Sequence, residues 1–133
     1  MHRAIGLNWV ELILGVTVNV NAMESAYLDC IEACRKCIAD CQYCLLQMSG
    51  RESKNDCPLC CILCIESCSA ALQFLLADSQ YAKEYCSICA KVCQWCAEQC
   101  AQHDHKHCED CANSCVKCME ECQKVVMMFS DEI

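Results

Sequence analysis

The sequence predicts an all-α protein, an up-down-up-down antiparallel four-helix bundle with a cysteine-lined core. Twenty of its 133 residues are cysteine, and they form four groups of five whose neighbouring members are mostly three or four residues apart. Such steps return to one face of a helix, whereas a strand would place the side chains on both faces. Each group therefore predicts one helix with a stripe of thiols. The groups are Cys30, Cys34, Cys37, Cys41 and Cys44; Cys57, Cys60, Cys61, Cys64 and Cys68; Cys86, Cys89, Cys93, Cys96 and Cys100; and Cys108, Cys111, Cys115, Cys118 and Cys122.

The first two predicted helices cover residues 24–47 and 57–77. A polar stretch at residues 49–56, which contains a glycine, separates them. Pro58 falls in the first turn of the second helix, where proline is tolerated because the missing N–H has no helical partner there. The connection is short, so we expect these two helices to be antiparallel neighbours.

The other two predicted helices cover residues 80–102 and 106–128. Asp78 and Ser79 precede the third helix and are expected to cap its start. The fourth helix repeats the cysteine spacing of the third, which indicates a repeated helical hairpin. A histidine-rich turn lies between them.

Residues 1–22 differ in character from the rest of the chain. They contain an apolar stretch that is interrupted by Glu11 and two asparagines, which argues against stable membrane insertion. An ordered packing arm, an upstream extension with Met23 as the true start, and an export signal are the three interpretations. We therefore divide the chain into an N-terminal extension of unassigned role, residues 1–22, and a bundle, residues 23–133.

The predicted connectivity gives the bundle two unlike ends. Apolar and aromatic residues from all four helices should meet at one end, which we call the closed end; soft ligands should meet at the other, which we call the mouth. The closed end comprises Tyr27, Leu28, Leu72, Phe74, Leu75, Leu76, Tyr81, Tyr85, Val125, Val126, Met128 and Phe129. The mouth comprises Cys44, Met48, Cys57, Cys100, His103, His105, His107 and Cys108.

Charge excludes one class of partner. The net charge is −8, with ten basic residues among eighteen acidic ones. The basic residues form no stripe and are not interleaved with aromatic side chains, so a nucleic acid is not an expected ligand. The charged positions of the predicted helices instead describe a solvated outer face.

The thiol stripes favour high-capacity binding and storage of Cu(I) by a protein that is not an enzyme. Thiolates select soft ions such as Cu(I), and bridging thiolates bring the stoichiometry to about one metal per cysteine. Twenty thiolates with about twenty Cu(I) ions leave a nearly neutral core, as burial requires. All twenty cysteines are therefore candidate ligands. Candidate ligands at the mouth are His103, His105, His107 and Met48, with a solvated loop and rim packing as the competing interpretations.

Two other classes of protein compete with this interpretation. Five tetrahedral zinc sites would leave about −10 of charge in the bundle, and a disulfide scaffold needs only a few bridges. The alternative is therefore a structural zinc or disulfide-stapled helical interaction module. A thiol oxidoreductase is not favoured, because no cationic group accompanies any cysteine pair to lower its pKa.

The run CAEQCAQHDHKHCEDC at residues 96–111, with four cysteine helices in order over residues 24–124, resembles the bacterial copper storage proteins, in particular their cytosolic branch. The resemblance implies a homotetramer of bundles that stores many Cu(I) ions and is folded without metal, with histidines at the entry end. It also implies a cytoplasmic location, with export as the alternative if residues 1–22 act as a signal. Exchange partners would be a copper chaperone or a copper-requiring enzyme. The dense thiols at Cys57, Cys60 and Cys61 depart from the family's usual arrangement.

Overall fold

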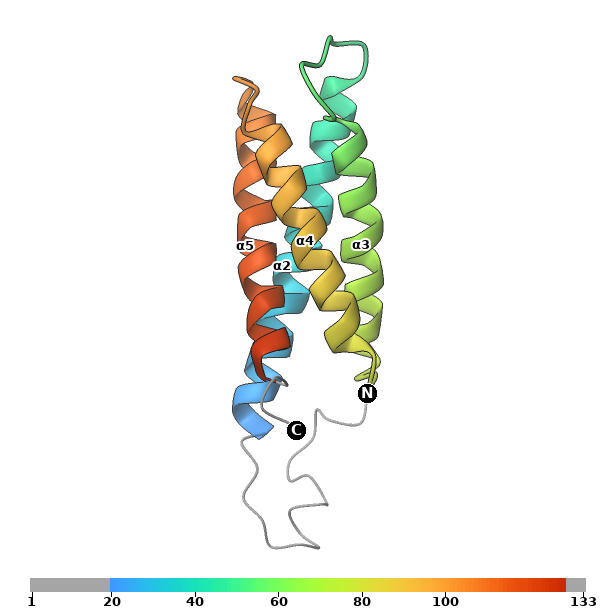
Figure 1. Cartoon of the computed structure of the whole chain (residues 1–133), viewed down its shortest axis with the longest axis vertical. Helices are drawn as coiled ribbons and strands as arrows, with labels where there is room; N and C mark the ends of the chain where they lie inside the picture. The colour runs from blue at the N-terminus through green and yellow to red at the C-terminus, as the bar shows by residue number, and fades with distance from the viewer. Residues whose placement is uncertain (1–19, 129–133) are drawn as a thin grey trace, which may run out of the picture.

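The computed structural model describes residues 20–128, which form four antiparallel α-helices and contain no strand. Helices adjacent in sequence run side by side in opposite directions, and the last packs against the first (Figure 1). Each helix therefore contacts two neighbours around one axis, which confirms the predicted bundle. The helices are α2 (Val20–Met48), α3 (Leu59–Leu76), α4 (Ala82–Cys100) and α5 (Lys106–Met128).

The observed helix boundaries differ from three of the four predicted residue ranges. Helix α2 begins at Val20 rather than at residue 24, so it crosses the predicted division between residues 22 and 23. Helix α3 begins at Leu59, because Pro58 stands at the N-cap rather than in the first turn, and the Cys57–Pro58 peptide bond is cis. Helix α4 is shorter than predicted at both ends, whereas α5 has the predicted bounds.

The turn between α3 and α4 explains why the predicted cap was misplaced. Asp78 adopts a left-handed conformation with φ of 51°, and the Ser79 N–H donates to the Phe74 carbonyl at 3.0 Å. This is the usual way to satisfy the last carbonyls of a helix. Asp78 and Ser79 therefore end α3, and Tyr81 occupies the N-cap of α4. Ser79 Oγ still contributes, since it accepts the Tyr81 N–H at 3.1 Å.

The closed end is packed by apolar residues from all four helices. Leu75 and Val125 are fully buried, and the rings of Phe74 and Tyr85 stack with centroids 4.0 Å apart. Two residues assigned to this end were predicted wrongly, because Leu28 and Tyr81 are 61% and 54% exposed. Leu28 lies on the outer face of α2, and Tyr81 lies at the N-cap of α4, before the helix begins. Phe129 lies outside the described residues.

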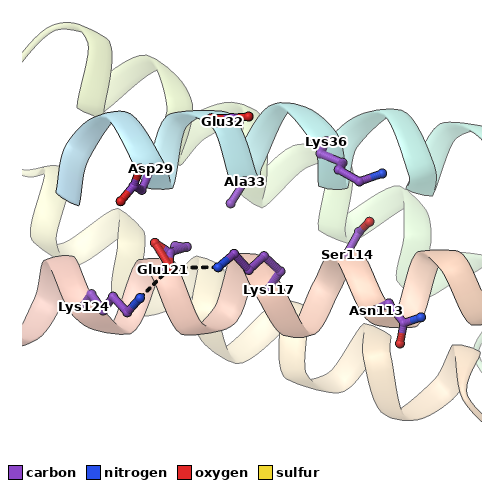
Figure 2. Close-up of a pocket in the computed structure, with 9 residues that line it drawn as sticks. All are labelled: Asp29, Glu32, Ala33, Lys36, Asn113, Ser114, Lys117, Glu121 and Lys124. Atoms are coloured by element: carbon purple, nitrogen blue, oxygen red, sulfur yellow. Dashed lines mark hydrogen bonds and ion pairs between the residues drawn. The ribbon is translucent and has the colours of Figure 1, made fainter. Parts of the chain in front are cut away.

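A charged groove of about 490 Å³ runs between α2 and α5 (Figure 2). The Glu121 side chain lies at its floor, only 3% exposed, and Lys124 Nζ and Lys117 Nζ approach its Oε1 at 2.8 and 3.4 Å. The hydrogen bond from Lys124 lowers the pKa of the Glu121 carboxyl. This carboxylate is therefore paired on the outside of the bundle, separate from the thiols.

Helix α3 is the one helix within residues 20–128 that is long and apolar enough to cross a membrane, with a mean hydropathy of 2.0. In the bundle it packs against α2 and α4, and its thiols are buried. The core helices of water-soluble bundles also have this composition.

Truncation at the closed end should test the packing. We expect Leu75→Ala to lower the free energy of unfolding by about 2–5 kcal/mol, because it leaves a cavity where four helices meet. Leu46→Ala, at a side chain that is 71% exposed, should change it by less than about 0.5 kcal/mol. Guanidinium unfolding of the reduced, metal-free protein, followed by circular dichroism, measures both values. Equal losses in the two variants would contradict the packing described.

The Glu121 ion pairs should make stability depend on pH. The folded-state pKa of Glu121 is lowered, so its contribution is complete above the unfolded value of about 4.3 and is lost as the pH falls through the folded value. Glu121→Gln should therefore destabilise the protein by about 1 kcal/mol at pH 7 and by much less at pH 3. Unfolding curves at both pH values measure the difference. Glu120→Gln, at an exposed neighbouring position, is the control and should show no such pH-dependent loss.

Candidate metal centre

A column of thiols fills the axis of the bundle. All twenty cysteines are free and buried, and nineteen of them lie on helices. The thiols of α2 and α5 face one another as successive rungs, because two antiparallel helices with the same spacing keep a constant register. The Sγ–Sγ distances are 3.6 Å for Cys30–Cys122, 3.7 Å for Cys34–Cys118, 3.7 Å for Cys37–Cys115, 3.5 Å for Cys41–Cys111 and 3.8 Å for Cys44–Cys108.

A second set of rungs links the cysteines that precede or lie on α3 to those of α4. Its Sγ–Sγ distances are 3.9 Å for Cys57–Cys100, 3.6 Å for Cys64–Cys93 and 3.6 Å for Cys68–Cys89. Contacts of 3.7–3.8 Å join the two sets across the axis, for example Cys37–Cys64 and Cys61–Cys111. The result is one continuous network of sulfur atoms.

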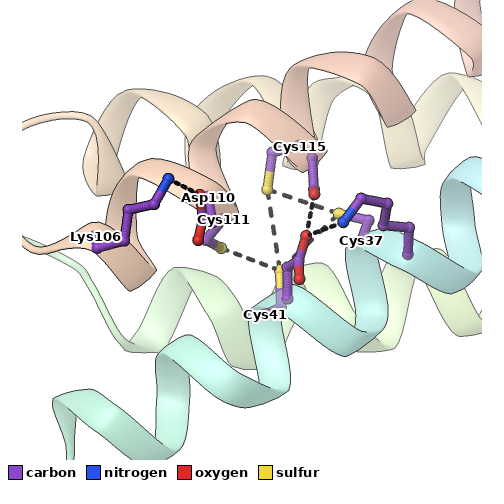
Figure 3. A network of polar contacts seen from close by, with 9 residues as sticks. Cys37, Cys41, Lys106, Asp110, Cys111 and Cys115 are labelled. Atoms are coloured by element: carbon purple, nitrogen blue, oxygen red, sulfur yellow. Dashed lines mark hydrogen bonds and ion pairs between the residues drawn. The ribbon is translucent and has the colours of Figure 1, made fainter.

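Neighbouring thiols form groups of four that share members. Cys37, Cys41, Cys64 and Cys115 have Sγ atoms within 4.8 Å of one another, and Cys41 and Cys115 belong to a second such group, with Cys96 and Cys111. Figure 3 shows Cys37, Cys41, Cys111 and Cys115 pointing toward one another from α2 and α5. Because one thiolate can belong to two groups, this arrangement suits metals that are bridged by sulfur rather than isolated four-coordinate sites.

The distances and surroundings describe thiols rather than disulfides. A disulfide bond is about 2.05 Å long, whereas the Sγ–Sγ contacts of the described residues are 3.5 Å or more.

Burial, with Cys44 and Cys57 nearby, raises the pKa of Cys108. Hydrogen bonding from the Cys100 thiol has the opposite effect on Cys57 and lowers its pKa. The pKa values of these two thiols at the mouth are therefore shifted in opposite directions.

The mouth brings three kinds of soft ligand together. Cys108 Sγ lies 3.8 Å from Met48 Sδ and 3.5 Å from His107 Nδ1. Met48 is only 1% exposed, so its thioether faces inward. The buried Nε2 atom of His107 has no hydrogen-bond partner among the described residues. A thiol, a thioether and an imidazole thus converge where the sequence predicted that they would.

The other two histidines have different surroundings. The His105 ring stacks on His107 with centroids 5.0 Å apart, and its Nδ1 lies 3.4 Å from Arg51 Nη1. His103 is buried, with one ring nitrogen 3.2 Å from the Lys54 amide nitrogen and the other 3.3 Å from the Gln99 carbonyl oxygen. The structure therefore places all three at the mouth but gives only His107 a nitrogen beside a thiol.

Sequence reasoning missed the polar residues that hold the loop before α3. Asn55 Nδ2 donates to the Gln99 carbonyl at 2.9 Å, and the Asp56 N–H donates to Gln99 Oε1 at 2.9 Å. An asparagine in a polar loop is common in turns, and nothing local in the sequence indicates that its partner lies on α4.

Comparison with known proteins gives concordant results. A curated relative, the uncharacterized cysteine-rich protein YhjQ of Bacillus subtilis, is 34% identical over 86 residues, which are 62% of this chain and 80% of that protein. The Cu(I)-bound copper storage protein BsCsp3 has a TM-score of 0.73 and 32% identity, over 76% of this chain and 98% of its own. A structure described as copper loading to a cytosolic copper storage protein from Streptomyces lividans, with five coppers, has a TM-score of 0.75 and 28% identity. The match covers 80% of this chain and 97% of that one.

The family match covers all the thiols described above and all four helices except the last residue of α5. The sequence fits the copper storage protein family over residues 17–127, which includes every cysteine and extends upstream of the predicted division at residue 22. This match, over well above half of the chain, shows that the protein belongs to the copper storage protein family.

Proposed function

We propose that this protein binds and stores Cu(I) at high capacity through the inward-facing thiolates of its twenty cysteines. The observation that carries this proposal is the continuous network of free, buried thiols, with Sγ atoms 3.5–4.0 Å apart along the axis. The Cu(I)-bound relative and the relative with five coppers support the choice of metal and the binding of several ions. The family is one of storage proteins, and we propose no catalytic activity.

Charge and ligand sharing favour Cu(I) over zinc. The thiols of the described residues make their polar contacts with other thiols, with Met48 and with His107, and none with a lysine or an arginine, so the positive charge that balances the thiolates must come from the metal. One Cu(I) for each thiolate brings the core to about neutrality, whereas isolated zinc sites leave about two negative charges each. Each ion also displaces a thiol proton, so we expect binding to weaken as the pH falls.

We propose that copper enters at the mouth. The closed end is sealed by Leu75 and Val125, whereas the mouth presents Met48, His107 and Cys108 in contact. Because Cys44 lies 3.8 Å from Cys108, an ion held at the mouth can pass to the thiol network by exchange of one ligand at a time. His105 is proposed as an outer ligand, because its ring stacks on that of His107.

The cellular setting follows from the same thiols. Free cysteines persist in the reducing cytosol, so we propose a cytoplasmic location, which the cytosolic relative supports.

The exposed Leu59, Ile62 and Leu63 of α3 support self-association, and we propose the homotetramer that the family resemblance implies. A copper chaperone or a copper-requiring enzyme is the proposed exchange partner.

An anaerobic titration tests storage directly. Reduced protein should withdraw about twenty Cu(I) ions from a competing chromophoric chelator, because each thiolate can bridge two ions. The helical circular dichroism signal should be complete before metal is added. Saturation at about five ions or fewer, or a preference for zinc, would instead support the structural zinc or disulfide-stapled module.

Ligand variants test the entry site. Met48→Leu keeps the apolar volume but removes the thioether, and His107→Gln removes the imidazole. Each should slow the initial uptake of Cu(I) by about tenfold, the scale of losing one supporting group at a metal site, with little change in final capacity. Met119→Leu, at a partly buried methionine of α5, is the matched control. Stopped-flow loading from a Cu(I)–chelator complex measures the rates, and equal uptake by all four proteins would contradict entry at the mouth.

A further inference from the structure

Cys57 differs from the other nineteen cysteines because it lies outside the helices, in the turn before α3. Its side chain is nevertheless buried and only 1% exposed. Its Sγ lies in one four-thiol group with Cys44, Cys61 and Cys100 at the mouth. A helix therefore does not fix the position of this thiol, and other contacts must do so.

Those contacts come from residues 53–57, which we call the strap. Asn55 Oδ1 accepts the Cys57 N–H at 3.0 Å, and Asn55 Nδ2 donates to the Gln99 carbonyl at 2.9 Å and to Gln102 Oε1 at 3.0 Å. The Asp56 N–H donates to Gln99 Oε1. The strap is thus hydrogen-bonded to Gln99 in the last turn of α4 and to Gln102 just beyond it.

His103 completes this attachment. Its Nε2 accepts the Lys54 N–H at 3.2 Å and lies 3.4 Å from Ser53 Oγ, and its Nδ1 donates to the Gln99 carbonyl at 3.3 Å. A neutral imidazole has one donor and one acceptor nitrogen, and both are used here. A copper ion could bind His103 only after one of these hydrogen bonds was broken, whereas the buried Nε2 of His107 has no partner among the described residues.

We propose that His103 is a positioning residue rather than a copper ligand: it fastens the strap to the end of α4 and thereby holds the Cys57 thiol in the four-thiol group at the mouth. When the strap is released, that group keeps only its three helix-borne thiols. The consequence for copper rests on the proposed storage function: an ion bound at the mouth then exchanges faster. The positioning itself concerns the metal-free protein and does not depend on that function.

Site-resolved alkylation of the metal-free, reduced protein tests the positioning. Brief treatment with iodoacetamide, followed by mass spectrometry, gives the reaction rate of Cys57 relative to that of Cys34, which is deep in the bundle. His103→Ala should raise the Cys57 rate about tenfold, as expected when a hydrogen bond of ordinary strength no longer holds the strap closed. His103→Gln, whose amide oxygen can accept the Lys54 N–H, should stay within about twofold of the unsubstituted protein.

The outcomes of the alkylation experiment separate the explanations. Asp104→Ala, at an exposed position in the same turn, is the control and should not change the Cys57 rate. An unchanged Cys57 rate in His103→Ala would overturn the proposal. An equal rise at Cys34 would also overturn it, because it would show that the whole bundle had been destabilised.

Copper release provides a second readout. In the loaded protein, His103→Ala and Asn55→Ala should both accelerate the fastest phase of Cu(I) transfer to a chelator by about tenfold, with unchanged capacity and with rescue in His103→Gln. If His103 were instead a ligand, the Ala and Gln variants would behave alike and Asn55→Ala would not share their effect, which would overturn the proposal. Failure to bind copper would refute storage and leave the alkylation result to stand by itself.

Discussion

The structure depends on the contact between thiols across the bundle axis. Cysteine fills the positions that leucine would occupy in an ordinary bundle, and its small side chain packs as a hydrophobe only when four helices approach closely. The rungs between α2 and α5, such as Cys41–Cys111 at 3.5 Å, satisfy this requirement. Because the sulfur atoms lie this close to one another, a soft metal ion at any point on the axis would have two or more of them within reach. Packing and the proposed binding of Cu(I) therefore use one set of atoms.

The two ends of the bundle differ, because one is packed by apolar side chains and the other carries the proposed site of copper entry. Leu75 and Val125 at the closed end are fully buried, and each buries more apolar surface than the small side chain of a cysteine does. At the mouth, Met48 and Cys108 are buried as well, but the segments that follow Met48 and precede Cys108 along the chain are polar turns. Ion pairs such as those of Glu121 lie in the groove between α2 and α5, so these charged side chains are kept away from the column of thiols.

The sequence was sufficient to predict the features that repeat and insufficient for those that occur once. The cysteine spacing predicted the helices and their inward faces, and the short connections between helices predicted that Met48, His107 and Cys108 meet at one end. The ends of α3 and α4 and the exposure of Leu28 depend on single turns and local rotations. The role of His103 depends on its contact with Lys54, which is distant in sequence. No local pattern records such a contact.

The constant register of the rungs also determines how a bundle of this kind could change in size. A single residue inserted between Cys30 and Cys44 would turn every later thiol of α2 by about 100° away from the axis, whereas the same insertion at Gly50, in an open turn, would leave the register intact. Growth must therefore proceed by whole heptads in all four helices, each adding about 10 Å of length and about eight thiols. If the thiols hold copper as proposed, helix length sets the capacity of such a protein, and the capacity increases in discrete steps.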